Sequence, residues 1–423
     1  MDLPYPLGGK ERVVRVLLTG TYCSKNKGDA TMQQVFESVL KTELPGAQVS
    51  IASPFPDLDA VHYKSMPVLR SRRRNLPLAT IHWLVLEIMR LFRLRPQRYF
   101  PDAEVDAMIH ADVVVDLSGD MLTEDYGVLV GFSHFLPLLQ ALALGRPLVI
   151  CAQSIGPFHK LTPLAKWILS RSRLITIREK FSAGLISKLR GQAIRPIKTA
   201  DLAFMLQSAS EARTNAILVD EGIESANKLR LGVSVSALLA NRTNRHLGAA
   251  RQDKLVVFAR ALDRLIESTG TQVLLVSHVF GPKPSGDDRQ VAVRLGERMR
   301  NPVQLIRGEY RPEELKGIIA SCDVFVGCRM HANIAALDSC VPVLGIGYSH
   351  KTRGIMADLD LEEWVLPVEG LDVETLEAAI IRLIEQASDY RQQLSDRLPE
   401  IQRLSRKNIE LVARMIESNE KAG

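Results

Sequence analysis

Side chains that can hold an anion or move a proton lie close together in one stretch of the chain, residues 323–351, which reads DVFVGCRMHANIAALDSCVPVLGIGYSHK. Those side chains are Arg329, His331, Tyr348, His350 and Lys351. Arginine and lysine hold phosphate or carboxylate groups, and arginine can do so with two hydrogen bonds at once. Histidine changes its charge near neutral pH, so it can donate or accept a proton. Together these residue types predict a pocket for a small anion with a proton-transfer residue inside it.

Two apolar runs, residues 324–327 and 341–346, come directly before these side chains and suit buried parallel strands. Between the runs, ANIAALDS has the small apolar spacing of a helix packed closely on a sheet. Open α/β sheets bind ligands at the carboxyl ends of their strands, and a helix N-terminus favours an anion there. We therefore expect Arg329, Met330 and His331 in one turn at the ligand-binding edge of a sheet.

The same side chains also have structural interpretations that involve no ligand. An arginine after a strand often forms an ion pair, and a lone histidine is often a hydrogen-bonded structural residue. His278 and His350 also follow apolar runs, so they compete for the proton-transfer role. Lys351 could pair with a carboxylate, and Arg178 beside Glu179 could belong to the start of a helix.

Length and composition describe a globular protein of ordinary character. A chain of 423 residues exceeds what one hydrophobic core usually supports, so two domains are expected. The 46% apolar and 24% charged fractions are typical of globular proteins. The 54 basic and 48 acidic residues give a net charge of +6, which does not choose between an anionic substrate, a membrane surface and nucleic acid.

The cysteines and the N-terminus favour a cytoplasmic location. The five cysteines have no CxxC spacing, which predicts buried free thiols in a reducing compartment. The first residues, MDLPYPLGGKERVVRV, lack the apolar core of a signal peptide, and no apolar stretch is long enough to span a membrane.

Alternating apolar runs and helical patterns in both halves predict an α/β protein with two doubly wound, Rossmann-like domains and a cleft between them. We expect the first domain over residues 1–205, ending in the strand-like TADLAF at 199–204. A polar linker region, 206–228, follows, then the second domain over 229–385 and a charged helical tail over 386–423.

Two polar loops of the first half carry further candidate residues. The loop TGTYCSKNKGDAT (19–31) fits neither GxxxxGK[ST] nor GxGxxG, and it places Gly28 and Asp29 where a strand gives way to a helix. Asp29 could cap that helix or belong to a site. Asp120 lies in SGDMLTEDYG after another strand, where no metal-ligand spacing is recognisable. A ligand-facing turn or a helix cap is the better interpretation of that loop.

Residues 70–98 have the most unusual composition of the chain. The apolar LPLATIHWLVLEIMRLF lies between two groups of arginines and is too short to span a bilayer. A basic helix with a tryptophan can lie on an anionic membrane surface. The alternative is a buried helix with basic flanks, and the sequence leaves both open.

Short motifs occur along the chain in one order: NKGD (26–29), SGD (118–120), QSIGPF (153–158), REKFS (178–182), TADLAF (199–204), VSH (276–278), GCRMHA (327–332) and GIGYSHK (345–351). In this order the chain resembles the polysaccharide pyruvyl transferase family over residues 13–370. It departs from the family pattern where SGD replaces a glycine triplet, Met330 replaces a leucine and Leu202 replaces a proline.

The resemblance implies a GT-B-like fold, with the acceptor on the first domain and the donor on the second. Phosphoenolpyruvate would be the donor, and a sugar of a surface polysaccharide or its lipid-linked precursor would receive a pyruvate ketal. No cofactor, no metal and no nucleic acid are implied. His331 would be catalytic, and the substrate contacts would be Arg329, Met330, Lys351, Arg178, Tyr348, His278, Gly28, Asp29 and Asp120.

These residue types suit ketal formation. The enol methylene must gain a proton, phosphate must leave, and two sugar hydroxyls must attack in turn, which suits His331 as acid and base. Arg329, then Arg178, would hold the donor's anionic groups. The main alternative is a nucleotide-sugar-dependent GT-B glycosyltransferase. A third is a non-catalytic protein that binds a membrane through residues 70–98.

Overall fold

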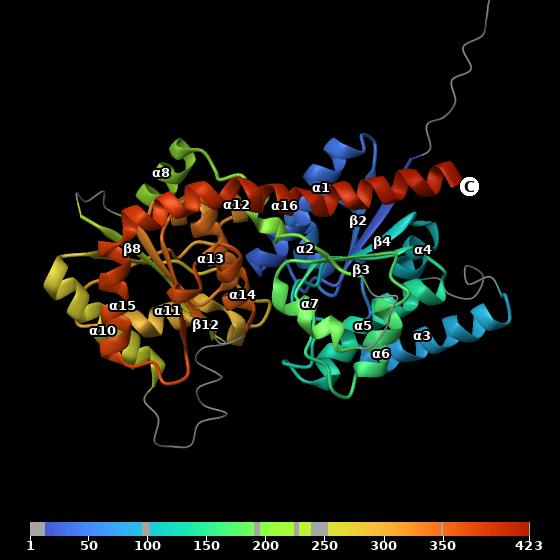
Figure 1. Cartoon of the computed structure of the whole chain (residues 1–423), viewed down its shortest axis with the longest axis horizontal. Coiled ribbons are helices and arrows are strands. Elements are labelled where there is room, and N and C mark those ends of the chain that lie inside the picture. The colour runs from blue at the N-terminus through green and yellow to red at the C-terminus, as the bar shows by residue number, and fades with distance from the viewer. Residues whose placement is uncertain are drawn as a thin grey trace, which may run out of the picture.

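The structure is a computed structural model, and it describes residues 13–94, 102–189, 195–223, 228–237, 253–347 and 350–422. Its strands form two parallel sheets, one in each half of the chain, with helices on both faces (Figure 1). The predicted α/β fold with two doubly wound domains is therefore confirmed. Strands buried on both faces explain why their sequences are continuous apolar runs rather than alternating ones.

The first sheet has seven strands in the order β3-β2-β1-β4-β5-β6-β7. The strands are β1 Arg15–Thr19, β2 Gln48–Ser53, β3 Val68–Arg70, β4 Val113–Asp116, β5 Leu148–Gln153, β6 Leu174–Ile177 and β7 Ile197–Lys198. The helices are α1 Lys27–Glu43, α2 Pro56–His62, α3 Leu76–Leu91, α4 Ala103–His110, α5 Val128–Ala143, α6 Thr162–Leu169 and α7 Lys180–Ser187.

The second sheet has six strands in the order β10-β9-β8-β11-β12-β13. The strands are β8 Arg230–Ser234, β9 Gln272–Leu275, β10 Gln304–Leu305, β11 Val324–Gly327, β12 Val343–Gly347 and β13 Val365–Pro367. The helices are α8 Glu211–Asp220, α10 Lys254–Thr269, α11 Asp288–Gly296, α12 Pro312–Ala320, α13 Met330–Asp338, α14 His350–Asp358, α15 Val373–Glu385 and α16 Ala387–Ala422, with 3₁₀ turns η2 Leu202–Met205, η3 Pro284–Gly286 and η4 Glu362–Trp364.

The long helix α16 runs across both domains, as Figure 1 shows in red. Leu394 and Leu398 belong to the core of the second domain, whereas Ile409 and Val412 belong to a core of the first. Asn408 is also buried, and its side-chain amide donates to the carbonyl oxygen of Ala200 at 2.9 Å. One helix therefore connects the two domains.

The strand expected over residues 199–204 is not present. Strand β7 ends at Lys198, and η2 follows. Asp201 lies between them, and its Oδ1 accepts a hydrogen bond from the backbone N–H of Ala203 at 2.8 Å. A side chain that caps the following turn in this way favours a helical turn over a strand.

Two arginines of the first group (residues 70–74), Arg72 and Arg73, serve the fold. Arg73 is buried, and its guanidinium donates to the carbonyl oxygens of Gly20 and Thr21. Arg72 forms an ion pair with Asp102. These arginines therefore hold the loop after β1 and the start of α4. The five cysteines are free, as expected, and four of them are buried.

Candidate active site

The loops at the carboxyl ends of the two sheets contact each other. The backbone N–H of Lys27, which follows β1, donates to the carbonyl oxygen of His278, which follows β9, at 3.1 Å. The N–H of Phe280 donates to the carbonyl oxygen of Lys25 at 2.8 Å. The ligand-binding edges of two open sheets therefore meet, which is where the sequence places its candidate residues.

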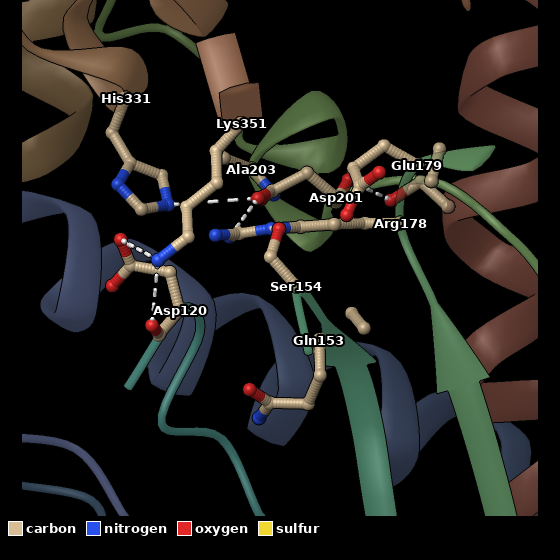
Figure 2. Close-up of polar contacts among 12 residues, drawn as sticks. Asp120, Gln153, Ser154, Arg178, Glu179, Asp201, Ala203, His331 and Lys351 are labelled. Atoms are coloured by element: carbon tan, nitrogen blue, oxygen red, sulfur yellow. Dashed lines mark hydrogen bonds and ion pairs between the residues drawn. The ribbon is translucent and has the colours of Figure 1, made fainter. Parts of the chain in front are cut away.

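Asp201 connects two of these residues, one from each domain (Figure 2). Its Oδ2 accepts a hydrogen bond from Arg178 Nη1 at 2.5 Å and lies 3.6 Å from His331 Nε2. The second distance is too long for a hydrogen bond but suits an ion pair with a protonated imidazole. Burial opposes ionisation of Asp201, but the charges of Arg178 and then His331 outweigh it and hold its pKa well below the usual range.

Arg178 is fully buried and directed into the site by strand β6, which ends one residue earlier. Its Nε donates to Ser154 Oγ at 2.9 Å. Within the described part of the chain, its Nη2 is buried and has no hydrogen-bond partner. Because an unpaired buried N–H group is costly, this atom is suited to donate to a bound anion. Glu179, rather than Arg178, caps α7 by accepting from the N–H of Ser182.

Lys351 lies in the first turn of α14 and reaches across to the first domain (Figure 2). Its Nζ donates to the carbonyl oxygen of Asp120 at 3.0 Å and to Asp120 Oδ2 at 3.3 Å. The ring of Tyr126 and the carboxylate of Asp125, 3.9 Å away, also surround it. Burial raises the pKa of Asp120, but Lys351 and then Arg178 outweigh this and bring it to about 2. Lys351 is therefore paired with a carboxylate here.

Gly28 is the point of closest approach between α1 and the imidazole of His331. A β-carbon at position 28 would lie 2.1 Å from His331 Nδ1. Any side chain there would displace one of the two groups. Glycine at this position therefore allows His331 to lie between α1 and Asp201.

Asp29 does not cap α1. That role belongs to Asn26, whose Oδ1 accepts from the N–H of Gly28 at 3.2 Å. Asp29 instead accepts from the N–H groups of Tyr22 and Cys23. Burial raises its pKa to about 6, against the effect of the Tyr22 N–H and the charge of His331. Asp29 therefore stabilises the loop after β1 through hydrogen bonds, and it is close enough to His331 for their charges to interact.

Arg329 is the N-cap residue of α13, and this position agrees with the turn between strand and helix that the sequence predicts. Both arms of its guanidinium contact Asp288, with Nε to Oδ2 at 2.9 Å and Nη2 to Oδ1 at 2.7 Å. Asp288 is itself buried and accepts from the N–H groups of Ala237 and Val279. Arg329 is therefore held by an ion pair within the second domain.

The remaining predicted residues lie around this centre. His278 is buried, and burial, followed by the charges of His331 and Arg329, lowers its pKa well below the usual range. A neutral imidazole of this kind is a poor proton donor at neutral pH. Met330 packs against the core of the second domain. Tyr348 and the side chain of His350 lie outside the described residues.

Sequence reasoning missed Asp201, Ser154 and Tyr126 as site residues. Asp201 belongs to TADLAF, whose apolar residues favour a strand, although an aspartate before a short apolar run is also a capping signal. Ser154 accepts a hydrogen bond from Arg178, which lies in another loop, whereas Tyr126 donates to Asp120 within the loop 118–127. Both residues lie in stretches that the sequence analysis singles out, QSIGPF and SGDMLTEDYG, but no pattern marks these two side chains within them.

The doubly wound domains and the meeting of their strand ends define a GT-B-like architecture. The UDP-GlcNAc 2-epimerase of Neisseria meningitidis is similar with a TM-score of 0.59 at 12% identity, over 95% of this chain and all of that one (100%). HepE of Anabaena, solved with UDP-glucose, is similar with a TM-score of 0.57 at 13% identity, over 97% and 100% of the two chains. At such identities the likeness shows the fold alone.

A profile of the family described as polysaccharide pyruvyl transferase matches residues 26–350, and the chain belongs to this family. The amylovoran biosynthesis protein AmsJ of Erwinia amylovora is 24% identical over 400 residues, which is 90% of this chain and 95% of AmsJ. Family and relative together indicate an enzyme of polysaccharide modification.

Proposed function

We propose that this protein transfers a pyruvyl group from phosphoenolpyruvate to a saccharide and forms a pyruvate ketal on two of its hydroxyls. The observation that carries the proposal is that Arg178, His331 and Lys351 come together from both domains at the ends of the two sheets. These are the cations and the imidazole that a small donor with a carboxylate and a phosphate requires. Membership of the pyruvyl transferase family supports the same reaction.

Donor binding would use the two cations that face each other across the domain boundary. Arg178 offers the buried Nη2, which has no partner among the described residues. Lys351 offers its ammonium group, at present held by Asp120. An anionic donor would therefore compete with the Asp120 carboxylate for Lys351, and part of the binding energy would be used to displace it.

His331 would move the protons. It would protonate the enol methylene, so that C2 becomes electrophilic, and then accept a proton from an attacking hydroxyl. The protonated imidazole would be stabilised by the Asp201 carboxylate, 3.6 Å from Nε2. Two hydroxyl protons are lost in the reaction. One is balanced by the new methyl group and one leaves on phosphate.

The acceptor would be a sugar of a surface polysaccharide or of its lipid-linked precursor. A lipid-linked acceptor would bring the protein to the inner, cytoplasmic face of the membrane. The region of α3, where the sequence suggested a membrane contact, would make that contact.

Phosphate release from phosphoenolpyruvate, measured with and without saccharide acceptors, tests the proposal. His331→Gln should lower the turnover number by about 100- to 10,000-fold. His110→Gln is the matched control, because this histidine lies on α4 with its side chain 51% exposed and should change nothing. Acceptor-dependent consumption of UDP-glucose with no phosphate release from phosphoenolpyruvate would instead support the glycosyltransferase alternative.

A further inference from the structure

Helix α3 carries a stripe of large apolar side chains that face solvent. Ile81, Leu84 and Ile88 are 55%, 47% and 52% exposed, and Leu91 and Phe92 at the end of the helix are 70% and 73% exposed. Spacings of three and four residues place them on one face of the helix. Burying this stripe needs a partner, because contiguous exposed apolar surface is unfavourable in water.

The opposite face of α3 is fixed to the rest of the first domain. Ala79, Leu86 and Met89 are buried, and the side-chain amide of Gln140 on α5 donates to the carbonyl oxygen of Ala79 at 3.3 Å. Figure 1 shows α3 at the outer edge of the first domain, away from the second. The stripe is therefore held in place and directed outward.

The charged residues of this surface are arginines. The one acidic residue between positions 76 and 94 is Glu87, and it is paired with Arg90. Every exposed residue in that range is apolar or basic: Pro77, Ile81, Leu84, Ile88, Arg90, Leu91, Phe92, Arg93 and Leu94. An apolar stripe that ends in cationic side chains is complementary to an anionic lipid surface.

We propose that the α3 stripe lies in the headgroup region of an anionic lipid bilayer and holds the first domain on the membrane. The inference deepens the proposed function, on which it rests for the lipid-linked acceptor. Among the helices in the described ranges, none is long and apolar enough to cross a membrane. Helix α3 can therefore lie on the membrane surface, with α5 on the side that faces away from the bilayer.

The contact depends on the apolar stripe more than on the first group of arginines. Arg72 and Arg73 are used within the domain, where they contact Asp102 and the carbonyl oxygens of the loop after β1. Arg90 and Arg93 at the end of α3 remain exposed. Removing the stripe should therefore weaken binding to any bilayer, whereas removing these two arginines should reduce the preference for anionic lipid.

Vesicle flotation of the full-length protein tests the proposal, with phosphatidylcholine vesicles that contain or lack phosphatidylglycerol. The wild type should float with the anionic vesicles, and Leu84→Ser/Ile88→Ser should bind at least about tenfold more weakly, since each lost methylene contributes about a fourfold factor. Val219→Ser is the matched control, because this valine is 75% exposed on α8, outside the stripe. It should float like the wild type.

Three results would overturn the inference: a wild type that stays in the aqueous fraction, a stripe variant that floats unchanged, or a dimer that the stripe variant converts to a monomer. The third would assign the stripe to a second copy of the chain. Unchanged thermal unfolding of the variants controls for folding, and Phe92→Ser provides a second variant at the end of the helix.

A phosphate-release assay with a soluble saccharide separates this inference from the proposed function. The stripe variants should keep their activity on a soluble acceptor. A wild type that floats but releases no phosphate would remove the proposed function and leave the membrane contact standing. An active wild type that does not float would remove the membrane contact alone.

Discussion

Arg178 and Asp201 form an ion pair, 2.5 Å from Nη1 to Oδ2, in which neither side chain is exposed to solvent. The same carboxylate oxygen lies 3.6 Å from His331 Nε2. The first domain therefore supplies the negative charge that faces the imidazole of the second. A buried carboxylate shared between a guanidinium and an imidazole fixes the position of both.

Asp201→Asn should destabilise the protein strongly, because it leaves Arg178 buried without a counter-charge. The expected loss in the free energy of unfolding is about 3–5 kcal/mol, measured by urea denaturation. Glu363→Gln, which breaks an exposed pair with Arg382, should cost about 0–1 kcal/mol. Equal losses in the two variants would contradict a special role for the buried pair.

The same pair has a pH signature. The folded-state pKa of Asp201 is below its unfolded value, so its contribution to stability is complete at neutral pH. It should be lost as the pH falls below the ordinary aspartate pKa of about 3.9. Urea unfolding at a series of acidic pH values should show that the free energy of unfolding falls more steeply with falling pH for the wild type than for Asp201→Asn.

Gly28→Ala should reduce activity more than stability. The new β-carbon would lie 2.1 Å from His331 Nδ1, so the imidazole would move from its place beside Asp201. A displacement of this kind costs about 100-fold in rate, measured as kcat/KM for phosphate release. Gly184→Ala is the control, because apart from adjacent residues and the backbone of α7 itself no atom lies within 4 Å of its added carbon. It should stabilise the protein by about 0.5–1 kcal/mol and leave activity unchanged.

Asp120→Asn should improve binding of an anionic donor. Asp120 is ionised at neutral pH and holds Lys351, so its neutralisation leaves the ammonium charge to the donor. We expect the KM for phosphoenolpyruvate to fall by about tenfold, as one unit charge at this distance allows. Asp125→Asn, 3.9 Å from Lys351, should have a smaller effect. Complete loss of activity in Asp120→Asn would instead place Asp120 among the groups that bind the acceptor.

Asp29 should make the protein less stable as the pH rises. Its folded-state pKa of about 6 exceeds the unfolded value of about 3.9, so the folded state binds a proton more tightly between these values. The wild type should therefore lose about 1–3 kcal/mol relative to Asp29→Asn between pH 4 and pH 7, by urea unfolding at each pH. Asp57→Asn, whose carboxylate is 88% exposed, should follow the wild type. A constant difference between wild type and Asp29→Asn across this range would show that Asp29 does not titrate there.

Sequence reasoning placed the Arg-Met-His turn and the strands on either side of it, because apolar runs and small-residue helices are local patterns, but it wrongly expected a strand over residues 199–204. It could not find the partners of the cations. Lys351 meets Asp120 across 231 positions, and Arg329 meets Asp288 across 41. Such pairs follow from which loops the two sheets bring together. For the same reason the sequence did not decide whether α3 is a buried or a surface helix. The residues next to Arg72 and Arg73 in the sequence do not predict what these arginines contact.

Helix α16 has a consequence for how the protein is made. Synthesis on a ribosome delivers the sheet of the first domain early, but Ile409, Val412 and Ile416, which belong to its core, come last. Until release, the nascent first domain must keep an apolar groove open for them. A product that stops before residue 405 would hold both complete sheets but an unfinished core in the first domain, so quality control should remove it.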